Sequence, residues 1–217
     1  MKNQLLICLA ILTLMGCGKS DDLPLTINET EVKLHYDGEF IFSIKNAPSV
    51  EWTSSDEFVG TIGSDGKFEA RHIGETTVTA KVKWQTVTAK VVVEPMVVGV
   101  IEPYMVFGKR KHDVKNVETR QLANETPATV FYTETSAYTF GAIYHFENNL
   151  FTAVDLLWND AKMEDSYVFY AERYELTSTS NNVYSFRDKS KSMVVELSYE
   201  RSPVGYTATY SKNTSTK

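Results

Sequence analysis

Apolar side chains recur at every second position in short runs along much of this chain. Phe40, Phe42 and Ile44 occupy alternate positions, and residues 87–93 place Val or Ala at every odd number. A period of two with one apolar face indicates half-buried β-strands. Glycine-containing turn pairs at residues 37–38 and 65–66 separate such runs, because Gly accepts the positive φ that hairpin turns require. About seven short strands in about seventy residues predict a β-sandwich over residues 25–95.

Three strings within this region carry a family resemblance: Val50–Asp56 (VEWTSSD), Asp65–Phe68 (DGKF) and Ile73–Ala80 (IGETTVTA). Together they resemble the group-two bacterial immunoglobulin-like domain, which has a buried tryptophan, an Asp-Gly hairpin and a glycine before a strand ending in Thr-Ala. Gly60 departs from the family pattern, where alanine is usual. The resemblance implies a spacer or adhesive module without catalytic residues, with Trp52 in its core.

A different pattern begins after a connector at residues 96–105. Asp113 is a candidate helix cap, and three apolar residues on one face predict a helix over 113–122. Strands are expected at residues 130–132, 138–146 and 150–158. The order then repeats: Asp160 caps a second helix with a stripe from Met163 to Tyr174, and further strands follow at 183–187, 193–199 and 204–210.

The second half therefore reads α-β-β-β-α-β-β-β, a candidate tandem duplication with an α+β fold. Sequential hairpins with one apolar face need a cover, which two amphipathic helices supply. We predict a six-stranded antiparallel sheet with both helices on one face. This order looks somewhat like the beta-lactamase-inhibitor-protein architecture, whose sheet is used as a binding surface. That likeness implies that the far face of the sheet is free for a partner.

The N-terminus indicates export. Lys2 precedes an apolar run at residues 5–14, which is too short to span a bilayer and fits a secretory signal. The string Leu14-Met15-Gly16-Cys17 resembles the lipobox of bacterial lipoproteins, which implies cleavage before Cys17 and lipid attachment to its thiol. A second acyl chain makes such anchoring stable. The alternative is an ordinary signal peptide followed by a chance cysteine.

An acidic pair at residues 21–22 follows the acylated position. It is similar to the export signal of Bacteroidetes lipoproteins and implies an outer-membrane protein displayed on the cell surface; the alternative is a solvated tether on the periplasmic face. Cys8 leaves with the signal and Cys17 carries lipid, so neither of the two cysteines remains for a disulfide or a thiolate metal site. The net charge of −6 argues against a nucleic-acid partner.

No pattern of catalytic, cofactor-binding or metal-binding residues stands out. The four histidines are isolated in sequence: His35, His72, His112 and His145. The acidic pairs at residues 56–57 and 164–165 lack the alternating spacing of a calcium loop, and no glycine-rich turn resembles a phosphate cradle. A basic run at residues 109–111 is expected to be solvated, with contact to an anionic surface as the alternative.

The aromatic residues leave two candidate ligand contacts, Trp84 and Trp158, while the row from Tyr138 to Phe146 is expected in the core. We predict a non-enzymatic lipoprotein in which the immunoglobulin-like module spaces a protein- or glycan-binding module from the membrane. The alternatives are a glycan-capture lipoprotein of a polysaccharide-uptake system and a hydrolase with an unrecognised site. The expected segments are a signal peptide, an acylated tether, the sandwich, the connector and the binding domain: residues 1–16, 17–24, 25–95, 96–105 and 106–217.

Overall fold

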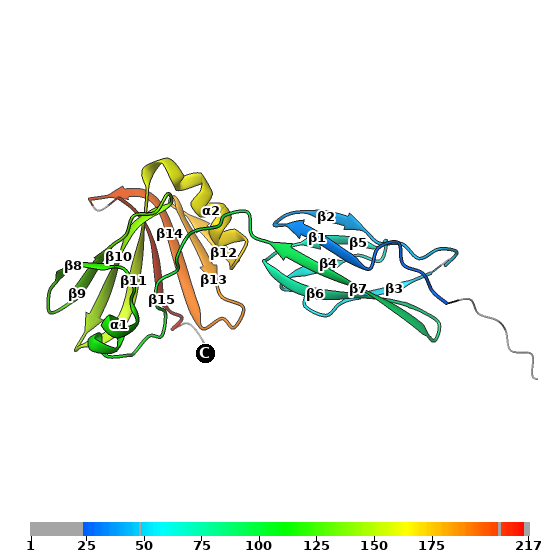
Figure 1. The fold of residues 1–217 in the computed structure, drawn as a ribbon, viewed down its shortest axis with the longest axis horizontal. Coiled ribbons are helices and arrows are strands. Elements are labelled where there is room, and N and C mark those ends of the chain that lie inside the picture. Colours follow the sequence, from blue (N-terminus) through cyan, green and yellow to red (C-terminus); the bar gives the residue numbers. More distant parts are fainter. Residues whose placement is uncertain (1–23, 48, 204, 215–217) are drawn as a thin grey trace, which may run out of the picture.

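The computed structural model describes residues 24–47, 49–203 and 205–214; the predicted signal peptide, Cys17 and the acidic pair lie outside these ranges. Two bodies lie end to end along the long axis, and each has its own hydrophobic core (Figure 1). Over the described ranges, no helix has both the length and the hydropathy needed to cross a bilayer.

The first body is a sandwich of two sheets. One sheet has the order β1-β7-β6-β3 and the other β2-β5-β4. Buried side chains from both sheets share one core, in which Phe68 and Val91 have no exposed surface. The predicted two-sheet sandwich is therefore confirmed. Its strands are β1 (Glu31–His35), β2 (Glu39–Ile41), β3 (Glu51–Ser54), β4 (Gly60–Ile62), β5 (Lys67–Ala70), β6 (Gly74–Val82) and β7 (Gln85–Glu94).

The first and last strands of the sandwich run in the same direction. β1 pairs with β7 in parallel over five residue pairs, from Glu31 opposite Lys90 to His35 opposite Glu94. The chain therefore enters the sandwich at one end and leaves it at the other. Figure 1 shows the start of the described chain, drawn in blue, at the end of the molecule farthest from the second body.

The second body is built on one antiparallel sheet of eight strands, in the order β12-β13-β14-β15-β11-β10-β9-β8. Its two halves each consist of a helix and a four-strand meander, and they join through their last strands, β11 and β15. The elements are α1 (Lys111–Val117), β8 (Gln121–Glu125), β9 (Thr129–Thr133), β10 (Thr139–Glu147), β11 (Leu150–Trp158), α2 (Met163–Ala171), β12 (Glu175–Ser180), β13 (Val183–Arg187), β14 (Met193–Ser202) and β15 (Gly205–Lys212), with a 3-10 turn, η1 (Asp160–Lys162), before α2.

The six predicted strands are present, but the predicted sheet was two strands too small. The edge strands β8 and β12 were missed, and the helix expected over 113–122 ends at Val117 because the chain turns into β8. Asp113 does not cap this helix from its first position; it accepts a hydrogen bond from the Arg110 amide at 3.2 Å from within the first turn. Asp160 opens η1 instead of capping α2.

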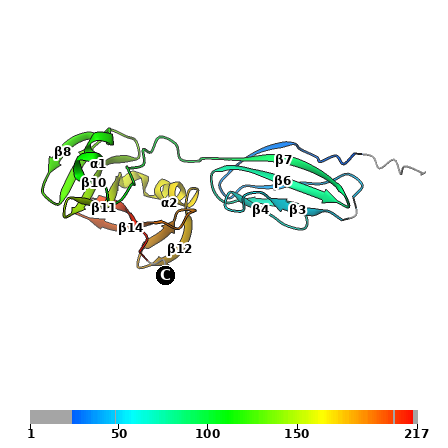
Figure 2. The ribbon, with the colours of Figure 1, turned by 90° about the horizontal axis from the view of Figure 1, so that it is seen from below.

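One face of the eight-stranded sheet is covered, as predicted, by both helices. Val114 of α1 and Phe169 and Tyr170 of α2 have no exposed surface and belong to the core of this body. The connector packs on the same face, where Val97 is buried and Tyr104 and Phe107 are partly buried. Figure 2 shows α2 on the side of the sheet that faces the sandwich.

Buried polar side chains hold the connector against this face. The Glu172 side chain has no exposed surface and accepts hydrogen bonds from the amides of Met96 (2.7 Å) and Val97 (3.3 Å). The Tyr104 amide donates to the Tyr144 hydroxyl at 2.9 Å. The Glu172 backbone carbonyl also accepts from the Ile73 amide of the sandwich at 2.7 Å. The connector is thus fixed by hydrogen bonds to the second body, and Glu172 also joins the sandwich directly to that body.

Candidate functional site

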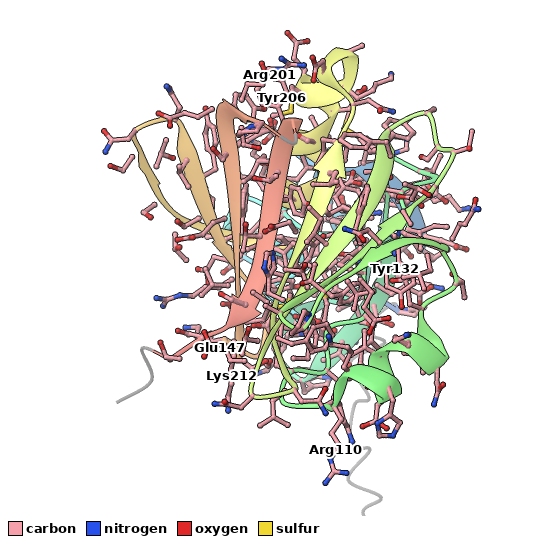
Figure 3. The ribbon with its side chains drawn as sticks, turned by 90° about the vertical axis from the view of Figure 1, so that its left-hand side faces the viewer. Arg110, Tyr132, Glu147, Arg201, Tyr206 and Lys212 are labelled. Carbon is pink, nitrogen blue, oxygen red and sulfur yellow. The ribbon has the colours of Figure 1, made fainter. Side chains whose placement is uncertain are left out.

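One side of the eight-stranded sheet is shielded by neither the helices nor the connector, which pack on the other side. Viewed along the long axis from that end, the strands lie in front of the sandwich (Figure 3). The register gives the side chains on this side from the three central strands, β10, β11 and β15. We call this surface the open face and define it by Ile143, His145, Asp155, Leu157, Thr207 and Thr209.

A polar cluster occupies the centre of the open face. Asp155 lies between two partners: His145 Nε2 is 2.8 Å from one carboxylate oxygen, and the Thr209 hydroxyl donates to the other at 2.6 Å. The hydrogen bond to Asp155 raises the pKa of His145, although partial burial of the ring opposes this shift. The cluster therefore favours the protonated, positively charged form of the His145 imidazole.

The same cluster lacks the arrangement of an activated nucleophile. Such a site needs a hydroxyl or thiol bonded to the base, with a third group orienting that base. The Thr209 hydroxyl is bonded to Asp155 and not to His145. The carboxylate is thus the shared acceptor of two donors, an arrangement suited to fixing side-chain positions on a recognition surface.

Apolar side chains border this polar cluster. Leu157 is only 1% exposed although it lies on the open face, and Ile143 and Phe131 beside it are half-buried. Phe140 joins them because a register shift between Thr139 and Gly141 interrupts the alternation of β10. The expected core row from Tyr138 to Phe146 is therefore confirmed for Ala142, Tyr144 and Phe146, but Phe140 lies outside that core.

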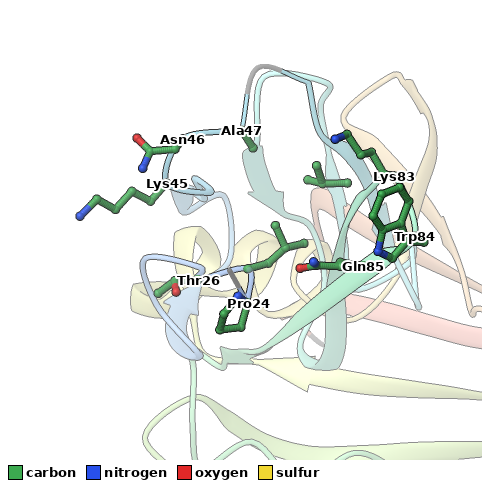
Figure 4. A pocket seen from close by; sticks show the side chains of 10 residues that line it. Pro24, Thr26, Lys45, Asn46, Ala47, Lys83, Trp84 and Gln85 are labelled. Atoms are coloured by element: carbon green, nitrogen blue, oxygen red, sulfur yellow. The ribbon is translucent and has the colours of Figure 1, made fainter. Parts of the chain in front are cut away.

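Trp84, one of the two candidate aromatic contacts, is exposed at the opposite end of the molecule. It is 70% exposed in the two-residue loop between β6 and β7, and the Lys83 ammonium lies 5.4 Å from its ring centroid. The loop lines a cavity of about 320 Å³ together with Pro24 and Lys45 (Figure 4). This cavity is therefore formed where the described chain begins.

Trp158, the other candidate, is fully buried in the second body. Its ring packs edge-on against Phe169 and Tyr170, and its Nε1 donates to the Tyr170 hydroxyl at 3.2 Å. A side chain in this position has no surface to offer a ligand. The proposed contact at Trp158 is therefore wrong, because the alternation of side chains along β11 places this residue on the covered face.

A second cavity, of about 470 Å³, lies between the two bodies and is lined by residues of both, including Tyr36, His72 and Tyr167. The His72 ring stacks on Phe58 at 3.9 Å, and its Nδ1 lies 2.5 Å from the Phe58 carbonyl oxygen. Lys189 of the second body pairs with Asp56 of the sandwich beside this cavity. The side chains around this cavity therefore take part in the packing of the two bodies against each other.

The remaining charged candidates have local partners. Within residues 24–47, 49–203 and 205–214, no three His, Cys, Asp or Glu side chains gather as metal ligands. Asp56 accepts from the Phe58 amide at 3.2 Å in a turn, and the acidic pair at residues 164–165 lies in the first turn of α2. From the basic run, Lys111 donates to the Thr126 and Pro127 carbonyls at 2.6 and 2.9 Å.

Comparison with known proteins yields weak structural neighbours that include two fragments of one S-layer protein. No family model and no curated protein sequence matches the chain. Domains 5–6 of the S-layer protein SbsC align over 90% of this chain and 86% of their own length, with 15% identity and a TM-score of 0.29. A larger fragment, domains 4–9 of SbsC, aligns over 90% of this chain and 27% of its own length, with 13% identity and a TM-score of 0.30. Similarity at this level carries no inference about fold or function.

Proposed function

We propose that this chain is a non-enzymatic, lipid-anchored bacterial surface protein whose second body binds a protein or a glycan through the open face. The observation that carries this proposal is the opposition of the two ends. The described chain begins at Pro24, at one end of the molecule, and the open face lies at the other end (Figure 1). A molecule tethered near residue 24 therefore presents the open face away from its tether.

The lipid anchor is supported by the sequence Leu14-Met15-Gly16-Cys17 after the short apolar run. Acyl chains on Cys17 would attach the protein to the outer membrane without a spanning segment. The acidic pair at residues 21–22 favours the outer surface over the periplasmic face.

Membership of the first body in the group-two bacterial immunoglobulin-like family is supported by the positions of its family residues. Trp52 is partly buried and its ring lies 6.2 Å from that of Phe42. Gly66 has a φ of +83° in the turn before β5, as the Asp-Gly pair predicts. Ala80, at the end of the Thr-Ala strand, is fully buried. We assign this module to residues 25–95 and the binding module to residues 106–217.

The spacer role is supported by the connector at residues 96–105. Its amides and carbonyls are bonded to Glu172, Tyr144 and Arg120, so it does not behave as a loose linker. A sandwich followed by a fixed connector holds the second body at a set distance from the tether.

A binding role for the open face is supported by its mixture of hydroxyl, charged and half-buried apolar side chains. Such surfaces combine hydrogen bonding with a desolvated contact area. The glycan-capture alternative depended partly on an exposed aromatic at Trp158, which is buried. Trp158 therefore cannot supply the exposed aromatic platform that this alternative predicted.

Mass spectrometry of the protein purified from its native membrane tests the anchor. We expect a mature chain that begins at Cys17 and carries acyl groups. A free thiol at Cys17, or a different mature start, would contradict the anchor. Protease treatment of intact cells separates surface display from the periplasmic face.

Site-specific photocrosslinking in living cells tests the open face. A photoreactive residue at Thr207 is expected to crosslink a discrete protein partner, or the purified chain is expected to bind a subset of a glycan array. The matched control carries the photoreactive residue at Thr88, an exposed threonine of β7 in the sandwich. The binding role would be refuted if the experiment gave no Thr207-specific crosslink and no glycan binding that Thr207→Arg abolishes.

A further inference from the structure

The β6–β7 loop projects from the end of the sandwich where the described chain begins. Val82 and Gln85 are paired, which leaves Lys83 and Trp84 as a two-residue loop. Lys83 takes a φ of +54°, and Trp84 is the most exposed large apolar side chain of the described residues, at 70%. We call Lys45, Lys83 and Trp84, with the adjoining cavity wall, the Trp84 tip.

A tightly closed hairpin fixes the direction of the tryptophan. β6 and β7 pair without interruption over nine residue pairs, from Gly74–Val93 to Val82–Gln85. The loop therefore continues a long two-stranded ribbon and has little freedom to fold its aromatic ring back onto the sandwich. An indole held outward in this way combines a large apolar surface with one N–H donor, which suits the boundary between water and hydrocarbon.

The two charged side chains that line the cavity together with Trp84, Lys45 and Lys83, are both positive. Among the residues that the structure describes, neither Lys45 nor Lys83 has an acidic partner, whereas the nearby Lys81 pairs with Glu51 at 3.1 Å. Two unpaired ammonium groups beside an exposed indole match the composition of segments that lie at anionic lipid headgroups.

Pro24, the first described residue, lines the same cavity as Lys45 and Trp84 (Figure 4). Seven residue steps separate Cys17 from Pro24, and a fully extended chain of that length reaches at most about 25 Å. Lipid on Cys17 would therefore keep Pro24, and with it the tip, within about 25 Å of the membrane surface.

We infer that the Trp84 tip docks into the headgroup layer of the membrane to which the protein is anchored, an inference that rests on the proposed acylation of Cys17. The indole enters the interface and the two lysines contact lipid phosphates. The tip and the acyl chains then form two separate attachments. Two attachments restrict the tilt of the sandwich and keep the open face directed away from the membrane.

Fluorescence quenching of the full acylated protein tests this inference. The protein is reconstituted into phosphatidylcholine–phosphatidylglycerol vesicles with either plain or brominated acyl chains. Of the three tryptophans, only Trp84 is exposed, since Trp52 is partly buried and Trp158 fully buried. We expect bromolipid to reduce the emission of the wild-type protein and to leave that of Trp84→Phe unchanged.

Charge reversal supplies a second test with a matched control. Lys45→Glu combined with Lys83→Glu is expected to reduce the quenching, because both charges then repel phosphatidylglycerol. Lys212→Glu reverses an exposed lysine of the second body and is expected to leave the quenching unchanged.

The outcomes separate the inference from the anchor on which it rests. If the acylated protein emits equally in plain and brominated vesicles, the docking of the Trp84 tip is contradicted, whereas the proposed lipid anchor is not. If mass spectra of the same sample show no lipid on Cys17, both the proposed anchor and the membrane docking that rests on it are refuted. A change of Trp84 emission on adding soluble laminarin or xylan, without bromolipid quenching, would assign the cavity to a glycan and overturn membrane docking.

Discussion

In the sandwich each sheet covers the other, whereas the eight-stranded sheet of the second body has no partner sheet. The core of the sandwich is closed mainly by aliphatic side chains and two phenylalanines, Phe42 and Phe68. The core of the second body is closed by two short helices and the irregular connector, through long aromatic side chains with polar ends such as Tyr144, Tyr170 and Tyr210.

The difference shows that a sheet covered by irregular chain needs additional hydrogen-bond partners for the backbone of that chain. A strand satisfies its backbone groups by pairing with another strand, but a connector laid on a sheet brings amides and carbonyls that need other partners. In the second body buried charged side chains supply them. Arg120 donates to the Ile101 carbonyl, and Arg173 reaches the Val97 carbonyl at 3.3 Å. Buried charge in this molecule follows from the way the sheet is covered.

Removing Arg120 should produce the largest effect and should confine it to the second body. Its side chain is 2% exposed, and it lies 3.0 Å from Glu118 and 3.2 Å from Glu134, the latter an ionic contact without good hydrogen-bond alignment. Arg120→Ala leaves two buried carboxylates without their cation, which should cost about 3–5 kcal/mol. Urea unfolding followed by hydrogen exchange in each body measures this loss.

The control for this substitution is Arg201→Ala, which breaks an exposed pair with Asp160 and should change stability by less than about 1 kcal/mol. Equal destabilisation of the sandwich by Arg120→Ala would show that the two bodies unfold as a single unit and would remove the basis of the comparison.

Gly60→Ala should give the second largest effect, in the sandwich alone. A β-carbon at this position would lie 2.3 Å from the Phe68 ring and 2.8 Å from the Glu69 carbonyl oxygen, so the ring and the strand must shift. Overpacking of this kind costs about 1–3 kcal/mol. The Phe68 ring thus fills the space that an alanine side chain would need at this position. Unchanged thermal stability in Gly60→Ala would contradict this explanation. Adding Phe68→Leu to the Gly60→Ala variant should recover part of the lost stability.

Lys189→Ala tests whether the ion pair between the bodies matters for their arrangement. The Lys189 side chain is 60% exposed, and the hydrogen bond that it donates lowers the pKa of Asp56. Since such exposed pairs contribute less than about 1 kcal/mol, we expect little change in stability and a rise in the pKa of Asp56, measured by NMR titration. A large change in small-angle scattering would show that this pair, and not the connector, sets the arrangement.

The smallest effect should be a pH dependence of the second body caused by His145. The bond to Asp155 raises the pKa of His145 above 6.5 in the folded state. The stabilisation is therefore complete below the unfolded pKa and is lost as pH rises through the folded pKa. Because the ring is 38% exposed, the loss should stay below about 1 kcal/mol. Asp155→Asn should flatten this slope across neutral pH, and an unaltered slope would assign the dependence to another group.

Strand alternation predicted the interior strands of the second body and failed at its edges. β13 occupies the predicted residues 183–187, whereas β8 and β12 were missed. Every residue of these two edge strands is exposed, so neither carries a period-two pattern of burial. The predicted helix over 113–122 extended too far for a related reason: Val117 and Leu122, read as part of its apolar face, are about half exposed, and α1 ends at Val117.

The candidate sites were less predictable than the fold. The sequence alone does not distinguish Trp84 from Trp158 as candidate contacts. Only the arrangement of strands places Trp84 in an exposed loop and Trp158 in the core. The cluster on the open face joins the β10–β11 hairpin to a distant strand, because Thr209, 54 residues after Asp155, reaches it only through the junction of β11 and β15. The one available signal was the position of His145 between the aromatic residues of its strand, which placed it opposite the core.

The parallel pairing of β1 and β7 has a mechanical consequence for a protein held at one end and bound at the other. Tension between the membrane and a ligand would pull β1 and β7 in opposite directions along their own length. The hydrogen bonds over their five residue pairs are then loaded in shear, and they must break together instead of opening one after another. Forced unfolding is governed by the barrier to this rupture, so the sandwich should resist stretching more strongly than its equilibrium stability alone indicates.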